Sequence, residues 1–200
     1  MNYFLVEAVL GIAVMIFPFL LFVMIRKMRC LHGLGIILLG IYLGMVWNVT
    51  GLPDIFNFHW EIRGGISVIP FKDFSAFGCI ANVVMLMPLG FFLPLLWKNC
   101  RSLWKMIAAG CVVSIFIESL QLFAFRATDI DDLLMNTLGG AAGYGCYVAV
   151  TKWFPGWKEI WSSPLQSRQE RQECISVFLM VIVLRILINP VLSAWVVMGL

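Results

Sequence analysis

The sequence predicts an all-α fold, a polytopic membrane helix bundle of about five to six transmembrane helices. Of the 200 residues, 62% are hydrophobic and only 12% are charged. The mean hydropathy is +0.95. A soluble domain is about half apolar and about a quarter charged. The composition therefore excludes an ordinary soluble protein and leaves no room for a separate soluble domain.

Six apolar runs approach the roughly 20 residues that a helix needs to cross the hydrocarbon core of a bilayer. In chain order they are 3–25, 34–49, 76–97, 106–125, 133–154 and 175–198. The second run is short and contains several glycines, which weaken it as a helix. The sixth run contains Arg185, Asn189 and Pro190, so we expect a kink or a break there.

The first run is predicted to be a membrane anchor and not a cleavable signal. No basic segment precedes it, Glu7 lies within it, and no small-x-small cleavage site follows it. Pro18 is expected to kink this helix. We divide the chain into N-terminal transmembrane helices (1–44), a membrane core (45–150), and a cytoplasmic linker with a C-terminal transmembrane helix (151–200).

The basic residues predict the orientation of the chain. Ten Lys and Arg residues lie in or beside the segments after the first, third and fifth runs, against three (Arg63, Lys72 and Arg126) in the other loops. Cytoplasmic loops carry the excess of basic residues in membrane proteins. We therefore expect both chain ends, residues 50–75 and residues 126–132 to lie outside the cytoplasm.

The two longest connections differ in character. Residues 50–75 are rich in apolar and aromatic side chains, which predicts a loop that packs on the bundle or lies in the membrane interface. Residues 155–173 fit either an amphipathic segment on the inner surface or a plain charged loop. The six cysteines are scattered without a CxxC pair, so we expect free thiols.

Familiar catalytic and cofactor motifs do not occur in the sequence. It contains no P-loop, HExxH or GxSxG pattern. His32 and His59 are isolated in the sequence, so a zinc site is not expected. The sequence predicts no metal site and does not identify a cofactor.

Polar residues inside the fourth run are the first candidates for function. Ser114, Glu118 and Gln121 are spaced by four and three residues and share one helix face. An acidic residue at the centre of a membrane helix costs about 2.5–3.5 kcal/mol, so these side chains are expected to face protein or water. Gln121 is placed to donate to Glu118, and Arg126 to reach back toward it. Glu118 is a candidate catalytic acid or base, and the alternative is an interhelical clamp.

A second group follows directly. Arg126, Asp129, Asp131, Asp132 and Asn136 surround the predicted start of the fifth helix. Asp129 is placed to cap that helix, and Asp132 and Asn136 share a face. The carboxylates and the arginine suit a cationic or polar head group, or a divalent cation, and spacing alone does not choose between them.

Further positions suggest helix packing. Asn82 lies well inside the third run and should find a partner on another helix. The patterns Gly139xxxGly143 and Gly40xxxGly44 predict close helix contacts, the first bringing Asn136 near Glu118. Arg185, in the sixth run, is placed to pair with Glu118 or Glu7, or to extend toward the interface.

Taken together, three segments resemble the VanZ-like family of small bacterial membrane proteins. They are NVVMLMPLG (82–90), SIFIESLQ (114–121) and RATDIDDLLMNTLGG (126–140), and the resemblance covers about residues 45–150. It implies a multi-pass protein of the bacterial cell membrane. The family takes its name from a protein that lowers sensitivity to the glycopeptide antibiotic teicoplanin, and the resemblance implies no known reaction.

Two functions remain open from the sequence. The first is a non-enzymatic resistance factor whose outer polar site binds a lipoglycopeptide antibiotic or alters its access to a lipid-linked cell-wall precursor. The second is an intramembrane enzyme that modifies an outer-leaflet lipid or such a precursor, with Glu118 as acid or base. The expected partners are membrane lipids with one of these ligands, and no nucleic acid. The expected binding residues are Asn82, Ser114, Glu118, Gln121, Arg126, Asp129, Asp131, Asp132 and Asn136.

Overall fold

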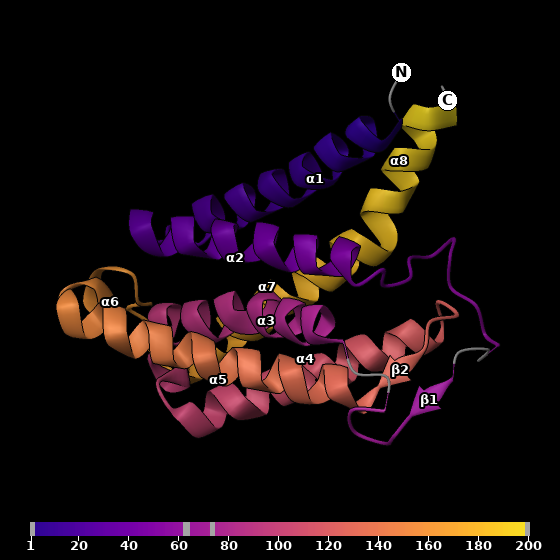
Figure 1. Cartoon of the computed structure of the whole chain (residues 1–200). Helices are drawn as coiled ribbons and strands as arrows, with labels where there is room; N and C mark the ends of the chain where they lie inside the picture. Colours follow the sequence, from indigo (N-terminus) through magenta and orange to yellow (C-terminus); the bar gives the residue numbers. More distant parts are fainter. Residues whose placement is uncertain (1–2, 62–64, 73–74, 199–200) are drawn as a thin grey trace.

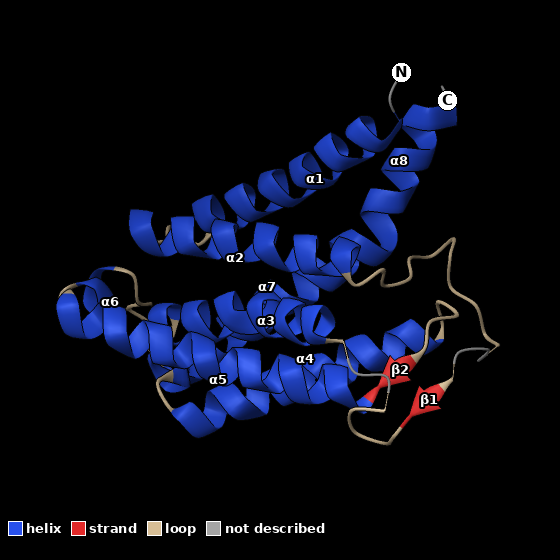
Figure 2. Cartoon of the chain, in the orientation of Figure 1, coloured by secondary structure: helices blue, strands red, loops and turns tan. Residues whose placement is uncertain are grey.

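A computed structural model describes residues 3–61, 65–72 and 75–198 of the chain, with side chains from residue 11 to residue 196 within these ranges. The described residues form helices joined by short links, except for the long loop between α2 and α3, with one pair of two-residue strands (Figures 1 and 2). The elements are α1 (Tyr3–Ile25), α2 (Cys30–Val49), β1 (Ile66–Ser67), α3 (Ala76–Leu96), η1 (Lys98–Cys100), α4 (Leu103–Leu122), β2 (Thr128–Asp129), α5 (Ile130–Trp153), α6 (Trp157–Ile160), α7 (Ser167–Val183), η2 (Leu184–Ile188) and α8 (Asn189–Met198).

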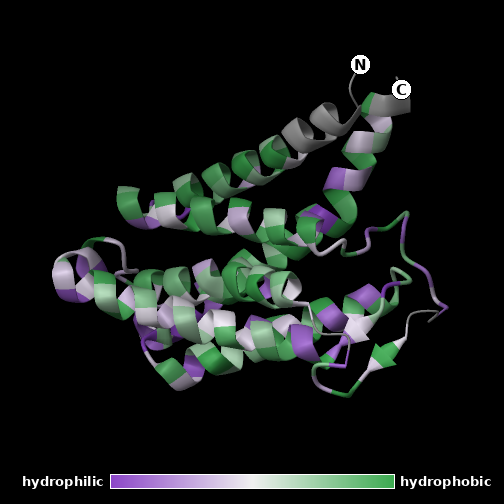
Figure 3. Cartoon of the chain, viewed as in Figure 1, coloured by the Kyte–Doolittle hydropathy of each residue, from purple (hydrophilic) through white to green (hydrophobic). Residues whose placement is uncertain are grey.

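The predicted all-α membrane bundle is confirmed. Four helical segments are long and apolar enough to cross a membrane: Cys30–Val49, Ala76–Leu96, Leu103–Leu122 and Ser167–Val196. The apolar stretch Gly11–Ile25 of α1 is shorter. Most of the ribbon of these helices has the green of hydrophobic residues in Figure 3. The second run, expected to be short, forms a full helix of 20 residues.

The helix α5 differs from the prediction that residues 133–154 form an apolar membrane-crossing run. It is 24 residues long, but its sequence includes Asp131, Asp132, Asn136 and several glycines, and it is not among the four apolar spans. It packs against both α3 and α4. The polar residues of α5 are therefore covered largely by neighbouring helices, and the three helices form one tightly packed unit.

Glycines let α3 and α5 approach until their backbones touch. A Cβ atom added at Gly90 would lie 2.0 Å from the carbonyl oxygen of Gly140, and one added at Gly143 would lie 2.0 Å from that of Met87. A Cβ atom at Gly139 would lie 2.4 Å from the carbonyl oxygen of Val83. The predicted packing role of Gly139xxxGly143 is confirmed, and α3 is the closest of its partners.

The second glycine pattern packs α2 against α1. A Cβ atom at Gly40 would lie 2.6 Å from the ring of Phe19, and one at Gly44 would lie 3.1 Å from the side chain of Met15. Both Phe19 and Met15 are buried in the core. The helix α2 also contacts α3 and α7, so it joins α1 to the rest of the bundle.

The linker before the last membrane helix differs from both sequence alternatives, an amphipathic surface segment and a plain charged loop. After the short α6, α7 begins at Ser167, and its first turns bury Glu170 and Glu173. The Oε1 atom of Glu173 lies 2.7 Å from Nε2 of the buried His32 and accepts a hydrogen bond from Nε1 of Trp97 at 2.9 Å. These bonds tie α7 to α2 and to the end of α3.

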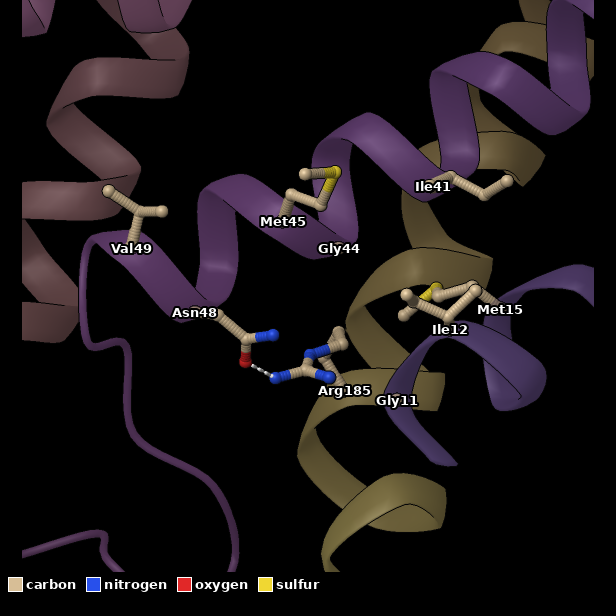
Figure 4. A pocket seen from close by; sticks show the side chains of 9 residues that line it. All are labelled: Gly11, Ile12, Met15, Ile41, Gly44, Met45, Asn48, Val49 and Arg185. Carbon is tan, nitrogen blue, oxygen red and sulfur yellow. Dashed lines mark hydrogen bonds between the residues drawn. The ribbon is translucent and has the colours of Figure 1, made fainter. Parts of the chain in front are cut away.

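The expected interruption of the last membrane helix is confirmed at Arg185. Residues Leu184–Ile188 form a π-helical segment, η2, and α8 continues from Asn189. An extra residue per turn of this kind redirects side chains. Figure 4 shows Arg185 reaching from η2 toward α2, where it donates a hydrogen bond to Oδ1 of Asn48. Glu7, one predicted partner, lies outside the described side chains.

The two ends of the bundle carry different loops. Both chain ends, β1, β2 and the long loop lie toward one side of Figure 1, and α6 lies at the opposite end. We call the first the acidic end (residues 50–75 and 126–132) and the second the basic end (residues 26–29, 98–105 and 155–166). The strands pair in parallel, with Ile66 opposite Thr128 and Ser67 opposite Asp129.

The loop at the acidic end packs on the bundle, which was one of the two predicted alternatives. The backbone N–H of His59 donates to the carbonyl oxygen of Phe123 at 2.9 Å, and the rings of Phe58 and Phe123 stack 4.9 Å apart. The N–H of Thr128 donates to the carbonyl oxygen of Gly65 at 3.0 Å. The loop therefore covers the junction between α4 and α5.

The close approach of α3 and α5 gives a first test. Gly143→Ala should lower the free energy of unfolding by about 1–3 kcal/mol, because the added methyl group overpacks a backbone contact. Gly145→Ala is the matched control, since nothing lies within 4 Å of its added Cβ atom. The control should be neutral or slightly stabilising, as alanine favours helix. Equal melting temperatures for both variants in detergent would contradict the backbone contact.

Candidate functional site

The candidate site lies at the acidic end, where α4 ends and α5 begins. Asp129 is the N-cap of α5, and its Oδ1 atom accepts the N–H of Asp131 at 3.0 Å. The hydroxyl group of Thr128 donates to the carbonyl oxygen of Glu118 at 3.2 Å. These two bonds fix the turn between the helices. The predicted capping role of Asp129 is confirmed.

Two polar side chains on one face of α5 bond to different helices. The Nδ2 atom of Asn82 on α3 donates to Oδ1 of Asp132 at 2.5 Å. The Nδ2 atom of Asn136 donates to Oγ of Ser114 on α4 at 3.0 Å. Asn82 therefore finds the interhelical partner that the sequence predicted. The two bonds hold α3 and α4 on either side of the start of α5.

Gln121 and Arg126 do not pair with Glu118, and the sequence expectation was wrong on both. The Nε2 atom of Gln121 and the Nη1 atom of Arg126 each donate to the carbonyl oxygen of Thr50 at 2.8 Å. Thr50 is the C-cap of α2, and carbonyl groups at a helix end have no partner within the helix. The two side chains therefore satisfy the end of α2.

A glycine makes room for this arrangement. Gly51 follows Thr50 and has a φ of +61°, a conformation that residues with a Cβ atom rarely adopt. A Cβ atom at Gly51 would lie 2.5 Å from Nη1 of Arg126. The turn after α2 is thus shaped to receive the guanidinium group.

The acids of the second group have separate tasks. Both carboxylate oxygens of Asp131 lie 2.9 Å from the backbone N–H of Phe71, so this side chain holds the loop. Asp129 caps α5, and Asp132 binds Asn82. Among the described residues, no group of three or more His, Cys, Asp or Glu side chains is arranged to hold a metal ion.

A pocket of about 160 Å³ opens beside Glu118. Glu118 is 6% exposed, and its Oε2 atom is buried without a hydrogen-bond partner among the described residues. The Oγ atom of Ser67 on β1 lies in the same condition. Ser119, Thr128 and Asp129 also line the pocket. Two polar atoms with unused bonding capacity therefore belong to side chains that line one cavity.

The structure gathers most predicted site residues at this end, but not around one point. Of the nine, the pocket is lined by Glu118 and Asp129 alone. Ser114 and Asn136 lie buried one turn deeper and bond to each other. Arg185 lines a different pocket, of about 220 Å³, between α1, α2 and η2 (Figure 4). Arg185 therefore does not pair with Glu118, which was one of the predicted alternatives.

Sequence reasoning missed the contributions of the long loop and of α2. Ser67 enters the pocket because β1 pairs with β2, a contact between residues 62 positions apart that no local pattern signals. Thr50 contributes a backbone carbonyl group, which the residue type does not reveal. Gly51 itself was a local signal in the sequence, since a glycine after a helix often marks a left-handed turn, and its φ is indeed positive.

Known proteins resemble this chain over the stretch that carries the candidate site. Residues 36–152 match the model of the family described as VanZ/LLP1, a stretch that contains the whole candidate site. The chain is 33% identical over 118 residues to "Protein VanZ" of Enterococcus faecium, covering 55% of this chain and 71% of that protein. No solved structure matches the chain.

The Asn82–Asp132 bond gives a test of the site geometry. Asn82→Ala and Asp132→Ala should each destabilise the protein, and the double variant by less than the sum. We expect a coupling of about 0.6–1.7 kcal/mol, as for interhelical hydrogen bonds in other membrane proteins. The measurement is a double-mutant cycle on unfolding in detergent. Additive effects would show that the two side chains do not interact.

Proposed function

Because this chain belongs to the VanZ/LLP1 family, we propose that it is a multi-pass protein of the bacterial cell membrane that lowers sensitivity to teicoplanin-type glycopeptide antibiotics. The site of action is the pocket beside Glu118, facing outward. The observation that carries the proposal is the buried Oε2 atom of Glu118, which has no hydrogen-bond partner among the described residues and belongs to a residue that lines that pocket.

A buried carboxylate oxygen without a partner is costly, because it has lost water and gained nothing in return. A ligand with an N–H or O–H donor would remove that cost and gain affinity from it. The Oγ atom of Ser67 on β1, another lining residue, offers a second bond. The pocket therefore favours a head group rich in donors, such as an amine or a hydroxyl group.

The rim of the pocket suits the rest of an amphiphilic ligand. Ile66, Val68 and Ile115 line the pocket and are themselves well exposed. Teicoplanin-type drugs carry an acyl chain that inserts into the membrane. With the donor group at Glu118, the chain would lie along this apolar rim, and the drug would be held away from lipid-linked precursor.

Glu118→Gln is the direct test of the proposed site. Glutamine has nearly the same shape but offers one acceptor oxygen and no charge, so the fold should persist and the resistance should be lost. The measurement is the tolerated teicoplanin dose in a sensitive strain at matched expression, with the melting temperature of the purified protein. Glu159→Gln is the matched control, because that side chain is 59% exposed at the basic end.

A comparison of two drugs tests whether the acyl chain of the antibiotic is needed for the effect. Expression of the unaltered chain should raise the tolerated dose of teicoplanin and change that of vancomycin little, since the proposal depends on the acyl chain. Equal effects on the two drugs would show that the acyl chain does not contribute to the effect. Full resistance in Glu118→Gln would end the role of this carboxylate.

A change at the rim tests occupancy of the pocket without touching Glu118. Ser119 is exposed and lines the pocket. Ser119→Leu should narrow the opening and reduce resistance, while Ser119→Ala, at the same position, should leave it unchanged. Both variants should melt close to the unaltered protein. Retained resistance in Ser119→Leu would show that nothing enters between α4 and β1.

The alternative is an intramembrane enzyme acting on an outer-leaflet lipid or a lipid-linked precursor. The same carboxyl group of Glu118 would serve as general acid or base, for which a buried group in an open pocket is suited. Arg126 is held by Thr50 and would have to leave it to bind a phosphate. Mass spectrometry of lipids and wall precursors with and without expression separates the two. A new or missing species favours the enzyme, and unchanged lipids with retained resistance favour the binding function.

A further inference from the structure

A larger cavity, separate from the pocket beside Glu118, lies between α2, α4 and α7. It has a volume of about 430 Å³ and walls that are almost wholly apolar. Leu43 of α2, Val113 and Ile117 of α4, and Phe178 and Ile182 of α7 line it. We propose that this slot binds one acyl chain of an anionic glycerophospholipid from the leaflet at the basic end of the bundle.

The slot exists because α4 and α7 pack on different partners. The helix α4 packs mainly on α5, and α7 packs mainly on α2 and η1. Two rim residues on α4 show that the slot opens sideways, toward the surrounding lipid: Val112 is 66% exposed and Phe116 is 38% exposed. In a membrane this opening faces acyl chains.

The length of the slot fits one leaflet. Lys105 and Ile117, both lining residues, are twelve positions apart on α4, which is about 18 Å along the axis of a helix. One leaflet contributes about 15 Å to the hydrocarbon core. A chain that enters at one end therefore stays within the slot over most of its length.

Water does not suit this space. A buried water molecule needs two to four polar partners, and the walls supply few. An acyl chain needs none and gains dispersion contacts with Phe178 and Val181. The volume also lies within the roughly 300–1,000 Å³ of apolar ligand sites in proteins.

The charge at one mouth selects the head group. Lys105 is exposed at the basic end of the slot, where its Nζ atom donates to the carbonyl oxygen of Asn99, and Lys98 lies in the same connection. Toward the acidic end the slot is lined by the apolar, buried Leu52 and Trp47. A phosphate group at Lys105 would lie at the depth where anionic head groups meet basic residues. An anionic lipid at this end satisfies both the mouth and the walls.

The test uses the purified chain in phosphatidylcholine vesicles that contain a phospholipid with a photoreactive acyl chain. The probe is either phosphatidylglycerol, which is anionic, or phosphatidylcholine. Mass spectrometry locates the labelled peptides. We expect the anionic probe to label α4 between Lys105 and Ile117 and α7 between Cys174 and Ile182, and the zwitterionic probe to label them more weakly.

Two variants separate the walls from the mouth. Ala109→Trp, or Val113→Phe if the first does not fold, should fill the slot and abolish this labelling, while Val148→Trp on the exposed face of α5 should not. Lys105→Gln should reduce labelling by the anionic probe by about fivefold, the effect of one basic residue near a membrane surface. Lys152→Gln, an exposed lysine on α5, is its control.

Either of two results would overturn the proposal. Undiminished labelling of α7 in a folded Ala109→Trp variant would place the chain outside the slot. Equal labelling by the two probes, unchanged in Lys105→Gln, would show that the anionic head group plays no part in binding. Neither result bears on Glu118, so this proposal and the proposed function fail independently.

Discussion

The contact between the backbones of α3 and α5 is the constraint on which the rest of the bundle depends. Without side chains at Gly90, Gly139 and Gly143, carbonyl oxygens of one helix lie where Cβ atoms of the other would be. Lipid offers no hydrophobic drive for helices to associate, so close packing must supply the attraction. The same approach brings the short side chains of Asn82 and Asp132 within bonding distance. Packing and site geometry therefore have one cause.

Much of the fold could be predicted because its signals are local. Apolar runs gave the membrane helices, glycine spacing gave the packing faces, and Asp129 gave the N-cap of α5. The site was only partly predictable. Helical periodicity placed Ser114, Glu118 and Gln121 on one face but could not say what lay opposite. That depends on the end of α2, which takes the donors of Gln121 and Arg126. A partner that is a backbone carbonyl group leaves no mark in the sequence.

The charged residues illustrate the same limit from the other direction. Glu170 and Glu173 resemble the solvated charges of a loop, yet both are buried at the basic end. Their partners are His32, Trp97 and the backbone N–H of Asn99, which lie about 70 to 140 residues away. Composition reports how many charges a segment carries and not whether distant residues cover them. Burial of a charged group is decided by the whole fold.

The hydrogen bonds of Glu173 also connect α7 to helices that the family match covers. The family match ends at residue 152, before α7 begins, yet the carboxylate of Glu173 accepts a hydrogen bond from Trp97 inside the matched stretch and bonds to His32 just before it. A chain that stopped at residue 152 would lack this acceptor for the indole N–H of Trp97 and this partner for the imidazole of His32. The helices of the matched stretch are thus held partly by a helix that lies outside the match.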